Sequence, residues 1–168
     1  MAKLGRYASG RKTVEILTED KALTAGDCGT YFGVSGMTTL TCSLPPASSL
    51  PNGWTCRLYQ MGGEAIAITS SAEGTFDTGK GAFVGNIVNL SADAAAPRQH
   101  GIAAGMLAAT KIEFSQLSLY GGSGMIGDYI DIILAKGPYS DNPEQHFFVV
   151  NGICSGSAGI VFSGSVTP

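Results

Sequence analysis

The sequence predicts an all-β domain, built as a sandwich or a barrel. Several short segments alternate apolar and polar side chains, which is typical of strands with one buried face. Gly and Pro clusters separate these segments at intervals of roughly 8–15 residues, which favours sandwich strands over βαβ units. The chain of 168 residues is long enough for one such domain with its own core.

The first half of the chain contains four of these segments. Residues 25–34 have the composition of a turn that leads into a strand. Residues 38–44, "TTLTCSL", alternate strictly, and so do residues 54–60, "WTCRLYQ". Residues 64–69 place two isoleucines on one face. We therefore expect a strand in each of these four segments.

The second half carries four more predicted strands, at residues 111–120, 129–134, 146–153 and 158–163. Between the halves, residues 90–110 are Ala-rich and show no alternation. Pro97 and Gly101 argue against a helix before residue 102. This stretch is therefore either a long loop that crosses the domain or the site of one short helix at 102–109.

Charge is distributed unevenly along the chain. The first twelve residues carry four basic side chains and no acidic one, whereas residues 13–168 carry six basic and thirteen acidic residues, a net charge of −7. We predict a basic N-terminal arm over residues 1–20 and a β-sandwich domain over residues 21–168. Charged residues make up only 14% of the chain, against about 25% in typical domains. Such a low fraction indicates that another copy of the protein covers part of the surface.

Several classes of protein are disfavoured. No apolar run approaches the roughly 18 residues that cross a bilayer, so no membrane role is expected. The basic start lacks a following apolar segment, so we expect no secretory signal and synthesis in a cytoplasm. Beyond the arm there is no Lys/Arg cluster, and no nucleic-acid partner is expected.

Candidate catalytic groups are scattered, and we expect no enzyme, no cofactor and no metal site. His100 and His146 lie far apart in sequence, and neither stands in a nucleophile motif. The Gly-rich residues 121–128 precede a predicted strand rather than a helix, which indicates a hairpin turn and not a phosphate site. Two close acidic pairs could serve a glycosidase, but thirteen acids make close pairs unavoidable. These pairs are Asp128 with Asp131 and Asp141 with Glu144.

Aromatic and cysteine side chains are expected mainly in the core. Most aromatic residues fall in predicted strands, where they pack a core or an interface, and a sugar-stacking platform is the alternative. The residues concerned are Trp54, Tyr59, Tyr120, Tyr129, Phe147 and Phe148. The cysteines form no C-x-x-C pair, which disfavours a zinc knuckle, and we interpret them as buried reduced thiols. They are Cys28, Cys42, Cys56 and Cys154, and the sequence leaves their disulfide state open.

Three segments together resemble small head decoration (cement) proteins of tailed bacteriophages. In "GRYASGRKTVEILTEDKALTAGDCGTYFGV" a short basic arm precedes a strand and a K-x-L-T-x-x-D-x-G turn. The segments "LTCSLPPASSLPNGWTCRL" and "GDYIDIIL…HFFVVNGICSGSAGIVFS" are similar to the middle and the end of the family pattern. The match is weak over residues 70–110, and the family's Trp near position 147 is replaced by Phe147 or Phe148.

The resemblance implies a jelly-roll-like antiparallel sandwich, usually a homotrimer, on the outer surface of the virion head. The major capsid protein would be the partner, and the protein would stabilise the expanded head. Similar β-modules occur in tail fibres and spikes, so a receptor- or glycan-binding module is the alternative.

We expect the arm to order on the capsid. Four cations in it would pair with acidic patches and two apolar side chains would act as anchors. These residues are Lys3, Arg6, Arg11 and Lys12, with Leu4 and Tyr7.

Overall fold

A computed structural model of the chain describes most of the predicted strands. The described residues are 12–35, 39–61, 66–70, 81–89, 98–101, 109–114, 127–136, 146–154 and 160–165.

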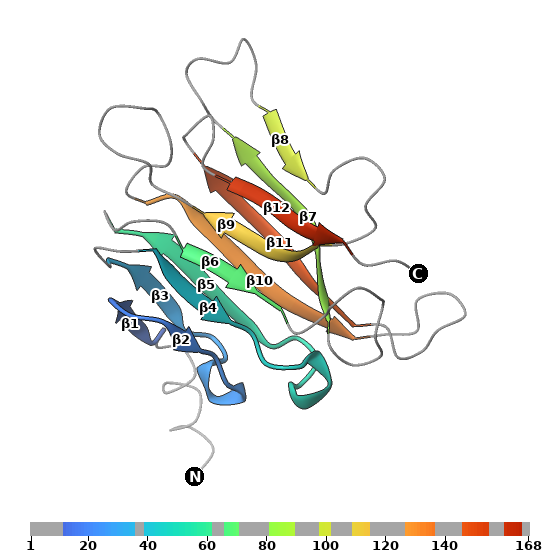
Figure 1. Cartoon of the computed structure of the whole chain (residues 1–168). Helices are drawn as coiled ribbons and strands as arrows, with labels where there is room; N and C mark the ends of the chain where they lie inside the picture. The colour runs from blue at the N-terminus through green and yellow to red at the C-terminus, as the bar shows by residue number, and fades with distance from the viewer. Residues whose placement is uncertain are drawn as a thin grey trace.

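Strands dominate the described part of the chain (Figure 1). Those of the first half are β1 (Val14–Leu17), β2 (Lys21–Ala22), β3 (Tyr31–Val34), β4 (Leu40–Ser43), β5 (Thr55–Gln60) and β6 (Ile66–Thr69). Those of the second half are β7 (Ala82–Asn89), β8 (Arg98–Gly101), β9 (Ala109–Phe114), β10 (Tyr129–Lys136), β11 (His146–Cys154) and β12 (Ile160–Ser165). Two 3-10 helices, η1 (Ala25–Asp27) and η2 (Ala47–Ser49), precede β3 and β5.

The strands form two facing layers that hydrogen bonds join into one mixed sheet (Figure 1). The larger layer has the order β1-β3-β5-β10-β11-β7-β8, and the smaller layer has the order β2-β4-β6-β9-β12. The layers meet where β7 and β9 share the single register pair Phe83–Ala109. At the opposite side, the short turn between β1 and β2 connects them through the chain itself.

The first six strands alternate between the two layers. Strands β1, β3 and β5 pair in parallel in the larger layer, and β2, β4 and β6 pair in parallel in the smaller one. Each passage from one layer to the other reverses the direction of the chain, so strands that return to the same layer run the same way. The later strands add mostly antiparallel pairs, with β7 and β11 parallel to each other.

The all-β prediction is confirmed, and the predicted strands in the described residues are present. The sheet is mixed rather than antiparallel throughout, because the chain winds between layers instead of forming successive hairpins. The jelly-roll connectivity expected from the resemblance is not confirmed. Sequence analysis also missed β2, β7 and β8.

Two segment boundaries differ from those expected. Residues 14–17, assigned to the arm, lie in β1 and pair with β3 of the same chain. Residues 98–101, assigned to the crossing loop, form β8 and pair with β7, and β9 already begins at Ala109. Residues 102–108, where a short helix was the alternative, lie outside the described residues.

The core fills the space between the layers. Inward positions follow the alternation of the sequence: Ile130, Ile132 and Leu134 are buried in β10, and Leu40 and Cys42 are buried in β4. The largest fully buried side chains are Trp54, Phe32, Phe83 and Phe148. Phe83 and Phe148 are register partners, and their ring centroids lie 5.8 Å apart. The indole Nε1 of Trp54 donates a hydrogen bond to the carbonyl of Thr24, so the one polar atom of this buried ring is paired.

A close backbone approach marks the pairing of β7 with β11. Gly85 has φ +123°, and a Cβ atom there would lie 2.2 Å from the carbonyl oxygen of Val150. Glycine is the residue that tolerates both this dihedral angle and this contact.

We expect Gly85→Ala to lower the free energy of unfolding by about 3 kcal/mol or more, because both the dihedral angle and the backbone contact become unfavourable. Urea denaturation of the purified chain measures this loss. The matched control is Gly26→Ala, whose Cβ would meet Thr24 Oγ1 at an ordinary 3.6 Å. It should change stability by less than about 0.5 kcal/mol. Equal stability of the two variants would contradict the assignment of Gly85.

Candidate interaction face

The predicted arm residues fall mostly beyond the described part of the chain. Lys3, Leu4, Arg6, Tyr7 and Arg11 lie outside the described residues. Lys12 is described, and its Nζ lies over the ring of Tyr31, 5.3 Å from the centroid. The arm therefore joins the body at the edge of the larger layer, beside β3.

The larger layer turns a second set of side chains away from the core. We call this surface the outer face. Register pairing aligns its members in rows that cross neighbouring strands. One row contains Val14, Tyr31, Arg57, Asp131, Asn151 and Asn86. The next contains Ile16, Gly33, Tyr59, Tyr129, Ile153 and Val88. A third contains Thr55, Ile133, Val149 and Val84.

An ion pair lies at the centre of the first row. The guanidinium of Arg57 donates from Nε to Asp131 Oδ1 at 2.7 Å and from Nη2 to Asp131 Oδ2 at 2.6 Å. This two-point geometry joins β5 to β10, and the hydrogen bonds to Asp131 raise the pKa of Arg57. The guanidinium carbon also lies 4.3 Å from the ring centroid of Tyr129 and 5.1 Å from that of Tyr31. The charge of Arg57 is thus held between two rings and one carboxylate.

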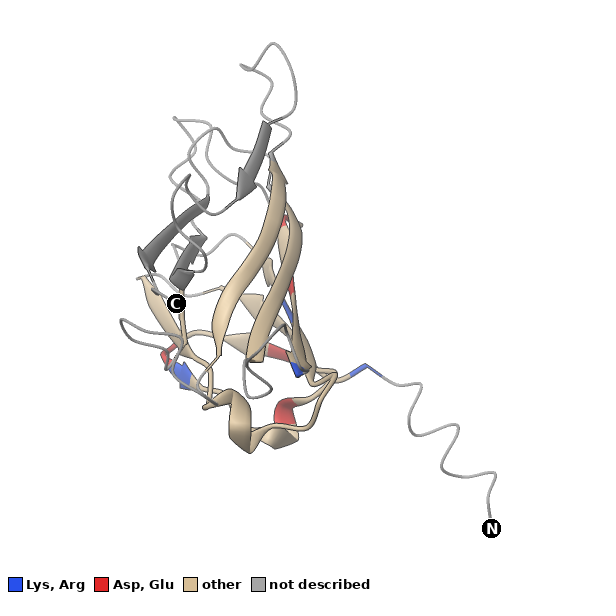
Figure 2. Ribbon diagram, turned by 90° about the vertical axis from the view of Figure 1, so that its right-hand side faces the viewer, with Lys and Arg blue, Asp and Glu red and all other residues tan. Residues whose placement is uncertain are grey.

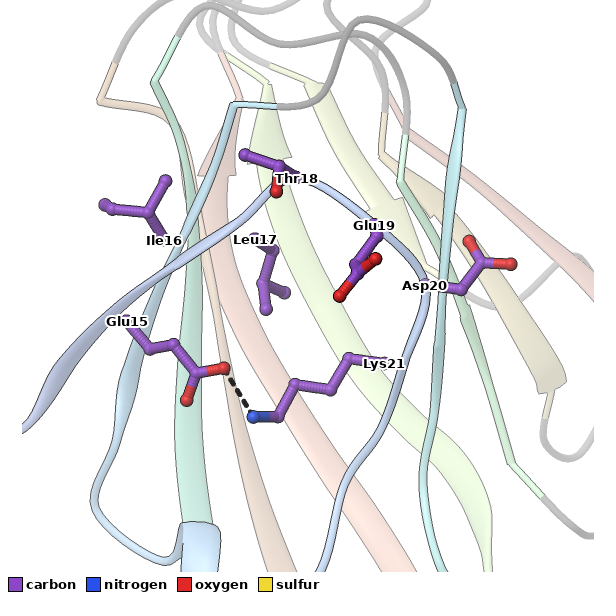
Figure 3. Close-up of a pocket in the computed structure, with 7 residues that line it drawn as sticks. All are labelled: Glu15, Ile16, Leu17, Thr18, Glu19, Asp20 and Lys21. Atoms are coloured by element: carbon purple, nitrogen blue, oxygen red, sulfur yellow. Dashed lines mark hydrogen bonds and ion pairs between the residues drawn. The ribbon is translucent and has the colours of Figure 1, made fainter.

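A second charged cluster lies at the β1–β2 end. Lys21 pairs with Glu15 and lies 3.8 Å from Asp27, and its Nζ is 5.2 Å from the Phe32 ring centroid. The hydrogen bond to Glu15 raises the pKa of Lys21. A cavity of about 200 Å³ beside this pair is lined by residues 15–21 (Figure 3). One continuous stretch of chain, residues 15–21, forms this cavity, and Lys21 in it is already paired with Glu15. This charged cluster therefore joins β1 to β2.

The acidic pair considered for catalysis does not converge. Asp128 is buried, whereas Asp131 lies on the outer face in the ion pair with Arg57. Asp141 and Glu144 lie outside the described residues, as do residues 121–126 of the Gly-rich segment. His146 is at the start of β11 opposite Lys136, and the side chain of His100 in β8 is not among those described.

The aromatic residues divide between core and surface. Trp54 and Phe148 are fully buried, so they cannot stack on a sugar in this structure. Tyr59 and Tyr129 are half-buried register partners on the outer face. Phe147 is half-buried in β11, and Tyr120 lies outside the described residues.

Within the described side chains, Cys42 and Cys56 are buried free thiols and Cys28 is an exposed free thiol. Burial raises the pKa of Cys42 from 9.0 to about 12 and also raises that of Cys56. The side chain of Cys154 is not among those described. The interpretation as buried thiols therefore holds for two of the three described cysteines.

Two kinds of feature are absent from the described residues. No group of three or more His, Cys, Asp or Glu side chains there could hold a metal ion. No helix in that part of the chain is long and apolar enough to cross a membrane.

Sequence reasoning missed the outer face. Its central contact joins Arg57 to Asp131, which are 74 residues apart. The alternation of β5 and β10 does give the outward position of each residue, but only the pairing of the two strands makes them neighbours.

Comparison with known proteins gave no match to a family model, to a curated protein or to a solved structure. The resemblance to head decoration proteins therefore rests on the quoted segments alone.

We expect the Arg57–Asp131 pair to stabilise the fold by about 1 kcal/mol, because two charge-assisted hydrogen bonds form in a partly shielded place. A double-mutant cycle of Arg57→Gln and Asp131→Asn, followed by urea denaturation, measures the coupling energy directly. Independent effects of the two substitutions would show that the contact adds nothing to stability.

Alkylation should distinguish the three described thiols. Cys28 is exposed and should react fully, whereas the buried thiols of Cys42 and Cys56 should stay protected until the chain unfolds. Peptide mass spectrometry after a brief iodoacetamide pulse measures each site. Because the folded pKa of Cys42 lies above its unfolded value, its contribution to stability is complete below pH 9 and is lost as pH rises towards about 12. Rapid labelling of Cys42 in the folded chain would contradict its burial.

Proposed function

We propose that this chain is a capsid decoration, or cement, protein of a tailed bacteriophage. In this proposal it binds the outer surface of the head lattice and stabilises the expanded head. The observation that carries the proposal is the separation of charge: a basic arm precedes an acidic β-body and joins it beside an exposed edge strand. The resemblance of three segments to the decoration family is a second support, and two of these segments lie outside the basic arm.

The attachment is electrostatic and multivalent. The major capsid protein is the proposed partner, with acidic patches that receive Lys3, Arg6, Arg11 and Lys12. Each exposed ion pair contributes only about 0.2–1 kcal/mol. A homotrimer presents three arms to a repeating lattice, and the high effective concentration of the second and third arms turns weak pairs into firm binding.

The stabilisation of the head follows from mass action. A protein that binds the expanded lattice and not its disrupted form lowers the free energy of the expanded lattice, in proportion to the logarithm of ligand concentration over the dissociation constant. No catalytic group takes part in this role, and neither a cofactor nor nucleic acid is needed. The chain would be made in the bacterial cytoplasm and would end on the virion surface.

One observation favours a second candidate, a receptor- or glycan-binding module of a tail fibre or spike. Tyr59 and Tyr129 are adjacent on the outer face, beside the planar pair of Arg57 and Asp131. Tyrosine rings and planar polar groups are the side chains that bind sugars by stacking and paired hydrogen bonds. A glycan array that retains the chain while phage heads do not would favour this second function.

Phage heads that carry no copy of this protein are mixed with the purified chain. Deletion of residues 2–12 should abolish co-sedimentation of the chain with these heads, because the cations proposed to bind the capsid are removed. The full chain should bind, should lose affinity as salt rises, and should raise the temperature at which the heads release DNA.

Two controls sharpen this test. The deletion retains Thr13, whose carbonyl accepts a 2.8 Å hydrogen bond from the Tyr31 amide, so cooperative unfolding should persist. Replacing Leu4 and Tyr7 by alanine tests the anchors while leaving all four cations. Undiminished binding by a folded deletion variant would reject the role of the arm, and failure of the full chain to bind any head would reject the function.

A further inference from the structure

Exposed apolar side chains gather on one side of the molecule. Five large apolar residues are exposed among the described side chains, with exposed fractions between 36% and 58%. They are Val14, Ile16, Met61, Val88 and Ile133. Four occupy outward positions in β1, β7 and β10, and Met61 directly follows β5, where its sulfur lies over Gly33 in β3. All five therefore belong to the outer face.

The described rows of this face carry no net charge, and the nearby cation Lys12 lies over Tyr31 at the edge of the face. Arg57 and Asp131 are its two charged groups, and they neutralise each other within the layer. Strands β7 and β11 contain no Lys, Arg, Asp or Glu, and tan ribbon predominates in the described part of the chain (Figure 2). The rest of the face consists of tyrosine, asparagine, threonine, glycine, methionine and aliphatic residues, and tyrosine, methionine and arginine are among the types enriched at protein interfaces.

The size of the face is that of a modest protein contact. From β1 to β7 there are five inter-strand spacings of about 4.8 Å, and the six strands, of 4, 4, 6, 8, 9 and 8 residues, are on average about 22 Å long. The flat area is therefore roughly 530 Å², about two thirds of the roughly 800 Å² per partner of a standard interface.

We propose that the outer face packs against a second copy of this chain. The inference rests on the proposed function in one respect, the expectation that several copies act together. Charge favours this occupant: residues 13–168 carry a net charge of −7, so the repulsion between two bodies is smallest where the surfaces that meet carry no net charge. Among the described arm residues, Lys12 reaches the edge of this face at Tyr31, but the one carboxylate in the described rows, Asp131, is already bound by Arg57 and offers no further cation a partner.

The apolar positions supply the attraction between copies. Ile133 lies between Thr55 and Val149 in its row, close to the middle of the layer. A charge there would be buried without a partner in the assembled state, whereas in a lone copy it would remain in water. Replacing Ile133 therefore separates association from folding.

Sedimentation velocity of the full chain between about 1 and about 100 µM tests the proposal. We expect concentration-dependent association, and roughly tenfold or greater weakening by both Ile133→Glu and Ile133→Lys. Testing an acidic and a basic substitution separates the effect of burying a charge from the effect of net charge. If net charge alone mattered, Ile133→Glu would weaken association and Ile133→Lys would strengthen it. Thr39→Glu, an exposed position beside β4 of the smaller layer, is the matched control and should associate as the natural sequence does.

Cooperative thermal unfolding, followed by circular dichroism, checks that each variant folds. If the Ile133 variants unfold, Val88→Lys at the other side of the same face replaces them.

A full chain that stays monomeric at about 100 µM would overturn the proposal. The proposal would also be overturned if both Ile133 variants associated normally, or if one associated more weakly and the other more strongly than the natural sequence. A monomeric chain whose Ile133→Glu variant loses affinity for heads or for a glycan would assign the face to that other occupant. Head binding of the full chain is measured separately, so failure of self-association and failure of the proposed function give different results.

Discussion

Burial of one apolar core between two layers is the constraint on which this structure depends. Leu58, Ile132 and Phe148 project inward from the larger layer, and Leu40, Cys42 and Ile68 project inward from the smaller one. Neither layer can bury its apolar face alone. The chain meets this constraint early by placing its first six strands alternately in the two layers, so that the core is lined from both sides before β7 begins.

The same constraint determines the surface. Side chains alternate along a strand, so every residue that fixes the core also fixes an outward neighbour. Leu58 is buried, and Arg57 and Tyr59 therefore face out; Ile130 is buried, and Tyr129 and Asp131 face out. A shift of one residue in β10 would place Asp131 in the core and break its contact with Arg57. The ion pair and the core thus favour the same register.

Strand positions could be predicted where alternation was strict, as in β4, β5 and β10. β7 was missed because Gly85 and the asparagines at 86 and 89 resemble turn residues, and β2 is too short to show a period. Parallel pairing could not be predicted, since spacings of this length suit hairpins equally well. The positive charge of the arm could be read from the sequence, whereas the outer face arises only when β5, β10, β11 and β7 become neighbours.

In the proposed assembly, the arm and the outer face would act over different distances. Charge attracts over about a Debye length, roughly 8–10 Å, whereas apolar contacts act only when surfaces touch. Assigning the cations to a lattice and the neutral face to sister copies allows both contacts to form at once. Because the two surfaces share Tyr31, which contacts Lys12 and Arg57, they adjoin at the edge of the larger layer.

The parallel pairing of β1 with β3 also has a mechanical consequence. Any tension on the leading segment enters the body at β1, whose ladder to β3 runs from the Thr13 carbonyl to the Leu17 carbonyl. A pull along the strand axis loads these hydrogen bonds together in shear, whereas a pull across it would open them one at a time. The leading segment therefore resists a pull along the axis of β1, whereas a sideways pull separates β1 from β3 more easily.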